Sequence, residues 1–192
     1  IDFNIENYSC ITPIYNSNAM NYLMMNQEKD KEIFVCYEGS LLSLFNFNDT
    51  WYFSSRRNLL NLNNNNNDNP HFKMFCSVIE QDGFNVNTFV DKLDKNLTYH
   101  FVLIHHQNKN IINYKKKFGE EYKKLCFIFA REKGTNKEIN SEEINCLFLT
   151  DNIFLPKRVE SIESFDETNT NNITSEPEEE GIIVKINGKV LK

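Results

Sequence analysis

The chain lacks several features that would assign it to a class of protein at once. Among its 192 residues, no apolar run approaches the roughly 20 that a membrane-spanning helix needs, so we expect no membrane partner. No signal peptide and no internal repeat is visible. Positive charge is not in excess, because the formal net charge is -6. This argues against binding of nucleic acid by bulk charge alone and leaves room for a local basic groove.

The cysteines lack a recognisable pattern as well. Their number is odd, and no two have the C-x-x-C spacing of a structural zinc site. We therefore predict buried thiols in a reducing, intracellular compartment, either cytoplasmic or nuclear. The sequence begins at Ile1, and we expect it to be a piece of a longer polypeptide, whose remainder would be a partner. The five cysteines are Cys10, Cys36, Cys76, Cys126 and Cys146.

What the chain does contain is material for a globular core, because 40% of its residues are hydrophobic and 16 are phenylalanines. Strand-forming segments dominate, with a few helical patterns between them, which favours an α+β fold of mostly antiparallel sheets. We predict strands at 32–47, interrupted by a turn at Glu38-Gly39, and at 51–55, 98–104 and 125–131, with an Asn-Gly hairpin at 181–191. Helices are predicted at 19–27, at 87–93 and from Ser141, and segment 72–81 is helix or strand.

Two segments look irregular. Residues 58–70 contain the run Asn63 to Asn67 and are predicted to be a disordered loop. Residues 159–179 are acidic and poor in apolar side chains, and we interpret them as a surface linker. Both would lie within one domain that extends over residues 1–192.

Two short motifs carry groups with chemical potential. In the first, Gly39 allows a sharp turn or the close approach of a ligand, and Glu38 presents a carboxylate at that turn. In the second, Glu180 stands immediately before the predicted hairpin, where a carboxylate is well placed to hold a metal ion or a ribose. Lysines within and after this hairpin, including Lys192, can face phosphates.

The order of these motifs resembles that of the ATP-dependent RNA ligases of the first phage type, in the ligase and capping-enzyme superfamily of nucleotidyltransferases. Their first motif, K-x-D-G-S-L, corresponds to Cys36-Tyr37-Glu38-Gly39-Ser40-Leu41, and a basic strand with Arg56 follows it. Their third motif is similar to Phe101-Val102-Leu103-Ile104, and their fourth, E-G-x-V, to Glu180-Gly181-Ile182-Ile183. Lys192 begins their last motif, so the resemblance covers about residues 32–192.

The resemblance implies a nucleotidyltransferase fold with a nucleotide cleft, and ATP and Mg²⁺ as cofactors. In such ligases the first-motif lysine attacks ATP and forms a lysyl-adenylate, from which AMP passes to an RNA end. Here Cys36 occupies the lysine position, and Val102 occupies that of an acidic residue that helps to hold nucleotide or metal. The resemblance leaves Glu38, Gly39, Arg56, Glu180 and Lys192 to bind the nucleotide, with Glu180 also as the metal ligand.

Three interpretations follow from these departures. Loss of the nucleophile and its acidic partner predicts a pseudoenzyme of RNA end joining and repair that retains RNA, nucleotide or partner binding. Alternatively, Cys36 is an unconventional nucleophile, or Lys29 or Lys31 replaces the missing lysine. The third interpretation is an unrelated α+β interaction module. A cleft lined by both Glu38 and Glu180 would distinguish the first two from the third.

Two further groups of side chains remain. Lys115, Lys116 and Lys117 form a basic patch that either contacts RNA phosphates or is a solvated face. His105 and His106 are adjacent, and neighbours on a strand point to opposite faces. We therefore interpret them as separate surface histidines and not as a metal site.

Overall fold

The computed structural model describes residues 21, 25, 31–63, 68–135, 137–139, 144, 148–160, 181–186 and 189–191. These residues form helices and largely antiparallel sheets, as an α+β protein does. The sequence predicts one domain over 1–192, whereas the structure has two compact units. The small unit combines Ile1–Cys36 with Lys157–Lys192, and the large unit is Tyr37–Pro156. No helix in the described part of the chain is long and apolar enough to cross a membrane.

The small unit contains a four-stranded antiparallel sheet in the order β11-β10-β1-β9. The inward positions alternate along β1 and β10, where Ile33, Val35, Val184 and Ile186 are buried. The predicted hairpin forms, since β10 and β11 pair, and its Asn-Gly turn lies outside the described residues. The strands are β1 (Lys31–Cys36), β9 (Arg158–Val159), β10 (Gly181–Ile186) and β11 (Lys189–Leu191).

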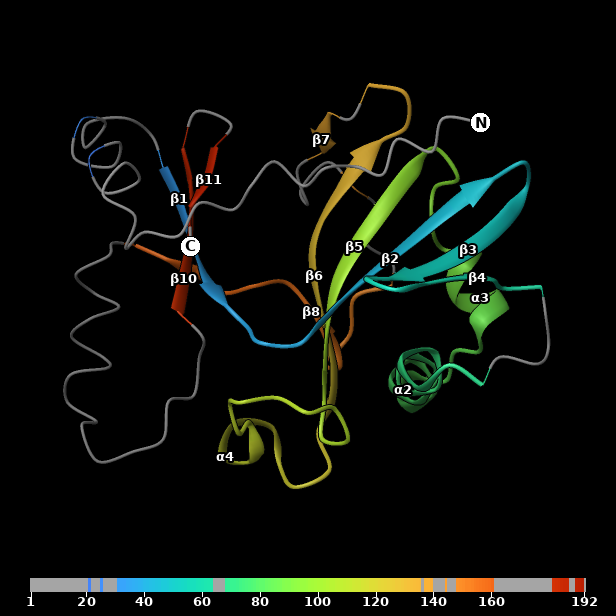
Figure 1. Cartoon of the computed structure of the whole chain (residues 1–192), viewed down its shortest axis with the longest axis horizontal. Helices are drawn as coiled ribbons and strands as arrows, with labels where there is room; N and C mark the ends of the chain where they lie inside the picture. The colour runs from blue at the N-terminus through green and yellow to red at the C-terminus, as the bar shows by residue number, and fades with distance from the viewer. Residues whose placement is uncertain are drawn as a thin grey trace. The chain divides into compact units, whose positions relative to one another are not determined.

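The large unit is built on a seven-stranded sheet in the order β4-β3-β2-β5-β6-β7, with β8 parallel to β6 (Figure 1). Every other pair in this sheet is antiparallel. The strands are β2 (Ser40–Phe47), β3 (Thr50–Ser55), β4 (Asn58–Asn61), β5 (Leu97–His105), β6 (Lys123–Glu132), β7 (Glu138–Ile139) and β8 (Ile153–Phe154).

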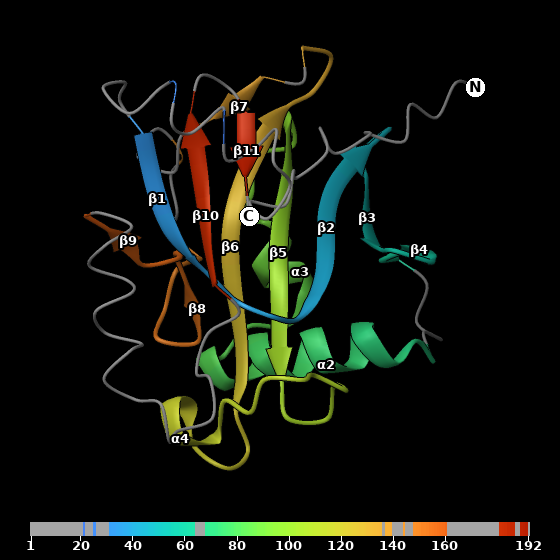
Figure 2. The ribbon, with the colours of Figure 1, turned by 60° about the vertical axis from the view of Figure 1, so that its left-hand side comes forward.

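Short helices cover one face of this sheet, where α2 crosses behind β5 and β6 with α3 beside it (Figure 2). Segment 72–81, which the pattern left as helix or strand, is mostly helix α2, because Asn69 caps it by accepting from the Phe72 amide and Pro70 stands in its first turn. The helices are α2 (Pro70–Ile79), the 3₁₀ turn η1 (Glu80–Asp82), α3 (Val86–Val90) and α4 (Lys115–Phe118).

The core of the large unit lies between the sheet and these helices. Alternate residues of the strands point toward it, among them Leu42, Leu44, Phe53, Phe101 and Leu103, which are at most 1% exposed. Side chains of the helices pack into the same core from the other side, namely Met74, Phe75, Val78, Ile79 and Phe89. The strands and α2 carry the candidate site at one end of this core.

Several local predictions need correction. The predicted loop at 58–70 is shorter, because residues 58–61 pair with β3 as β4 and Pro70 begins α2, while 64–67 lie outside the described residues. Val159 belongs to β9, and the predicted linker from 161 onward lies outside them as well. Of the helix predicted at 19–27 only Asn21 and Met25 are described, both helical, and the predicted helix start at Ser141 is not described.

Candidate functional site

The turn after Cys36 connects strands of different sheets. The sequence predicts a strand, a turn at Glu38-Gly39 and a second strand. In the structure β1 pairs with β9 and β10, whereas β2 pairs with β3 and β5. The thiol-bearing Cys36 ends β1 opposite Gly181 and is only 5% exposed. The chain that leaves β1 and the chain that enters β10 therefore meet at the same end of the small sheet.

Glu38 contacts the backbone of a loop more than 70 positions away. Its Oε1 accepts a hydrogen bond from the Ile111 amide at 2.9 Å, and its Oε2 accepts one from the Ile112 amide at 2.6 Å. The Glu38 amide donates to the hydroxyl of Tyr114 at 2.6 Å, and this tyrosine is fully buried. Hydrogen bonds from two amides to one carboxylate are charge-assisted, so the turn and the loop hold each other firmly. We call residues 106–122 the β5–β6 loop.

Gly39 and Ser40 continue this contact. A Cβ atom on Gly39 would lie 2.3 Å from the carbonyl oxygen of Leu103 and 2.6 Å from Cγ1 of Val102, so only glycine fits against β5 here. The Oγ of Ser40 accepts a hydrogen bond from Asn108 of the loop at 3.0 Å. Val102 thus packs against the turn, in a position where the resemblance implies an acidic residue.

Arg56 lies on the exposed turn between β3 and β4. In the antiparallel register Ser55 is opposite Leu42, and Ser40 is opposite Leu103. The turn with Arg56 and the start of β2 are therefore at the same end of the large sheet. Glu180 and Lys192, the other two expected nucleotide ligands, lie outside the described residues.

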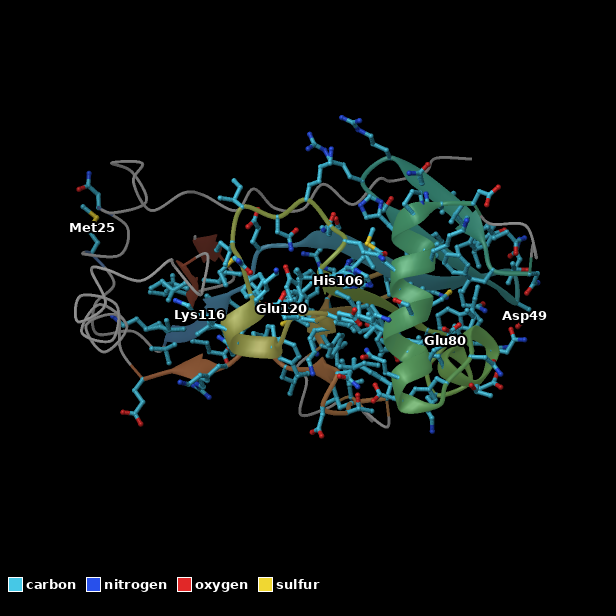
Figure 3. All side chains as sticks on the ribbon, turned by 90° about the horizontal axis from the view of Figure 1, so that it is seen from below. Met25, Asp49, Glu80, His106, Lys116 and Glu120 are labelled. Carbon is cyan, nitrogen blue, oxygen red and sulfur yellow. The ribbon has the colours of Figure 1, made fainter. Side chains whose placement is uncertain are left out.

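The predicted basic patch lies on α4, within the β5–β6 loop. Lys115 and Lys116 are exposed, and Lys115 forms an ion pair with Glu120 at 2.7 Å. Lys117 places its ammonium group 4.8 Å from the ring centre of Tyr37, a cation–π contact. Figure 3 shows Lys116 and Glu120 at this helix. The structure thus joins the patch to the turn that follows Cys36.

The aromatic rings beneath the patch explain how so short a helix is held. Tyr37 lies 5.3 Å from Phe154 edge to face, and 6.4 Å from Phe118. Tyr114 contacts Phe118 at 5.8 Å and Tyr122 at 6.0 Å, measured between ring centres. Aromatic pairs at these distances add about 0.5–1.5 kcal/mol each beyond the burial of their area. The basic loop therefore rests on a fixed support.

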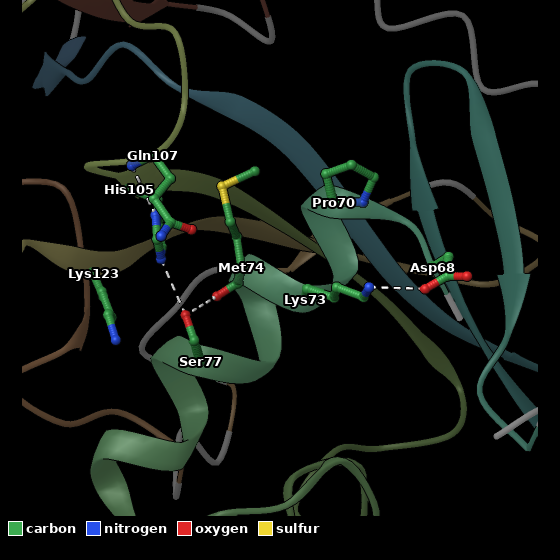
Figure 4. A pocket seen from close by; sticks show the side chains of 8 residues that line it. All are labelled: Asp68, Pro70, Lys73, Met74, Ser77, His105, Gln107 and Lys123. Carbon is green, nitrogen blue, oxygen red and sulfur yellow. Dashed lines mark hydrogen bonds and ion pairs between the residues drawn. The ribbon is translucent and has the colours of Figure 1, made fainter. Parts of the chain in front are cut away.

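A second constellation was not foreseen from the sequence. A pocket of about 430 Å³ lies between α2 and the ends of β5 and β6 (Figure 4). Ser77 of α2 and His105 of β5 meet there, with the hydroxyl 3.0 Å from Nε2 of the ring. The pocket is lined by Asp68, Pro70, Lys73, Met74, Ser77, His105, Gln107 and Lys123.

Hydrogen bonds fix the protonation state of His105. Its Nδ1 accepts from the amide of Gln107 at 3.1 Å, so the neutral ring carries its proton on Nε2 and donates it to Ser77. The Ser77 hydroxyl in turn donates to the carbonyl of Met74 at 2.8 Å. Burial lowers the pKa of His105 to about 4, with the charges of His106 and Lys123 adding to the effect. In this tautomer His105 cannot take a proton from Ser77, so the pair is not arranged as a nucleophile with its base.

The prediction that the two histidines are separate surface residues was wrong. His105 is 1% exposed and its ring stacks on that of His106, with 4.7 Å between the ring centres. Alternation along a strand does not separate them, because β5 ends at His105 and His106 already belongs to the loop. Their proximity creates no metal site: in the described part of the chain, no group of three or more His, Cys, Asp or Glu side chains is placed to hold a metal ion.

Among the described residues, those at the expected nucleotide-binding positions fit ATP poorly. Cys36 is a buried thiol in a strand ladder, Val102 offers no polar atom, and both oxygens of Glu38 accept main-chain hydrogen bonds. These three positions contain no lysine and no carboxylate that is open to a phosphate-bound metal ion. No protein-family model matches this chain, and no curated protein shows significant similarity to it.

Proposed function

We propose that this chain is an RNA-binding domain of the RNA-ligase type that no longer carries out self-adenylation. The order of its motifs supports the ligase type. The chemistry at two key positions supports the loss of activity, since Cys36 and Val102 stand where such ligases have a lysine and an acidic residue. Cys36 is only 5% exposed, so its thiol has little access to a bound nucleotide.

The observation that carries this proposal is the double contact of Glu38 with the amides of Ile111 and Ile112. In place of a nucleotide, the first-motif turn binds the β5–β6 loop and fixes the lysines that the loop presents. Residues 106–122 contain four lysines and two glutamates, in a chain whose formal net charge is -6. Such a local excess of positive charge on a fixed support suits contacts with RNA phosphates.

Binding of RNA is tested with a fluorescently labelled single strand and a variant in which residues 115–117 are changed to alanine. Each lysine that contacts a phosphate steepens the dependence of affinity on salt, so we expect the slope of log K against log salt to fall by about 2. The matched control replaces Lys92 and Lys95, which lie between α3 and β5, and Lys137, which precedes β7, and it should leave the slope unchanged. Equal losses in both triple variants would contradict a specific role for the loop.

Loss of self-adenylation is tested separately by incubation with α-labelled ATP and Mg²⁺. We expect no covalently labelled protein. A labelled band that disappears in Cys36→Ala and persists in Cys76→Ala would show instead that Cys36 is an unconventional nucleophile. A band that persists in both cysteine variants but disappears when Lys29 or Lys31 is replaced would assign the chemistry to a lysine before β1 or at its first position. Either result would overturn the proposed loss of activity and leave the RNA-binding experiment unaffected.

A further inference from the structure

The pocket beside α2 has the size and lining of a small-molecule site. Its volume of about 430 Å³ falls within the roughly 300–1,000 Å³ that is usual for ligand pockets. Figure 4 shows Lys123 and the His105–Ser77 pair on one side, and Lys73 with Asp68 on the other. The side chain of Met74 lies between them and supplies an apolar wall. We call this feature the α2 pocket.

The two sides of the α2 pocket differ in charge. Lys73 is neutralised by Asp68, whose carboxylate lies 2.8 Å from its ammonium nitrogen. Lys123 is half-buried, and among the described residues no carboxylate forms an ion pair with it. Its charge is felt by the neighbouring ring, because it contributes to the lowered pKa of His105. A cation that is half-buried without a counterion attracts an anion more strongly than an exposed lysine does.

Hydrogen-bonding groups accompany this cation. The Ser77 hydroxyl and the side-chain amide of Gln107 line the same pocket, and neither bears a negative charge. The neutral ring of His105 completes this side. The protons of Ser77 and His105 are already donated to Met74 and to Ser77, so Lys123 and the side-chain amide of Gln107 are the donors that this side offers to the acceptor oxygens of a phosphate group.

We propose that the α2 pocket binds a small phosphorylated molecule, with its phosphate beside Lys123 and its uncharged body against Met74. The phosphate supplies the counterion that Lys123 lacks, and the volume left over accommodates a body of several carbon atoms. This site is distinct from the lysines of α4 and does not depend on binding of RNA.

The proposal is tested by NMR titration of the full chain with inorganic phosphate and with glycerol 3-phosphate, against sodium chloride at the same ionic strength. We expect saturable shifts of the Ser77 and Lys123 amides and of the His105 ring. Because the His105 pKa is held low partly by the charge of Lys123, a bound dianion should also raise it. Glycerol 3-phosphate should bind more tightly than phosphate if the body contacts Met74.

Lys123→Met should weaken binding by about tenfold or more, which corresponds to the loss of one charge-assisted hydrogen bond. Lys123→Arg should retain the charge and most of the affinity, which separates loss of the site from loss of the fold. Lys116→Met is the matched control, since it removes an exposed lysine outside the pocket. Equal binding by the two methionine variants, or shifts no larger than those with chloride, would overturn the proposal. Neither result bears on the RNA-binding experiment, whose variants leave Lys123 intact.

Discussion

The buried ring of His105 makes the stability of the fold depend on pH. In the folded chain its pKa is lowered to about 4, whereas an exposed histidine in the unfolded chain titrates near 6.5. Between these two values the unfolded state binds a proton that the folded state does not bind. The contribution of His105 to stability is therefore fully present above about pH 6.5 and is lost as the pH falls toward 4.

The size of the effect follows from the two pKa values. One pKa unit corresponds to about 1.4 kcal/mol, so the interval between 6.5 and about 4 corresponds to roughly 3 kcal/mol. Most of this would be lost on acidification to about pH 4.5, which gives an expected loss of roughly 2–3 kcal/mol from this residue alone. Protonation also removes the acceptor at Nδ1 that the Gln107 amide uses.

Carboxylates titrate in the same range, so wild type is compared with His105→Gln, which does not titrate and can still donate to Ser77. Urea unfolding at about pH 7 and at about pH 4.5 gives the free energy of unfolding of each protein. We expect wild type to lose about 2–3 kcal/mol more than the variant between these conditions. His71→Gln serves as the control and should behave as wild type. Equal losses in wild type and His105→Gln would refute the assignment of a buried, neutral His105.

Three further predictions concern the turn and the helix. Gly39→Ala should lower the free energy of unfolding in urea by about 1–3 kcal/mol, because the new Cβ would meet the carbonyl oxygen of Leu103. Adding Val102→Ala should restore little of this stability, since the Leu103 carbonyl stays in place. Glu38→Gln can accept a hydrogen bond from only one of the two loop amides, so we expect its free energy of unfolding to fall by about 1–3 kcal/mol and proteolysis within the β5–β6 loop to be faster. Unchanged proteolysis would argue that the contact of Glu38 with Ile111 and Ile112 does not hold the loop. Burial and the charge of Glu80 raise the pKa of the Cys76 thiol to about 11. Because the thiolate is the reactive form, the rate of alkylation of Cys76 by iodoacetamide should rise about tenfold per pH unit above neutrality. A rate that reaches a plateau near pH 9 would contradict this.

Local patterns in the sequence determined most of the elements. Runs of strand-forming residues placed β3, β5 and β6 within a few positions of their observed bounds, and the Asn-Gly signal between two apolar runs placed β10. The apolar period of segment 72–81 did not decide between helix and strand. The Asn69 cap and Pro70 did, although the sequence interpretation placed them in a disordered loop.

The candidate site was only partly visible in the same patterns. Glycine at 39 was recognised as a turn residue, and the lysines at 115–117 as a basic patch. The direct reason for Gly39, a carbonyl 2.3 Å from its missing Cβ, comes from a strand more than 60 positions away. The pairing of Ser77 with His105 gave no signal, because the two residues meet only when α2 docks on the sheet.

Sequence by itself determined most of the longer strands, helix α3 and where the turn after Cys36 falls, because these depend on contacts between near neighbours. Only the tertiary structure decided that β1 and β2 enter different sheets, that Glu38 binds the amides of Ile111 and Ile112, and that His105 is buried. Pairing of strands and docking of helices are set by the summed burial of many distant residues, and no local pattern specifies which distant partner each of them meets.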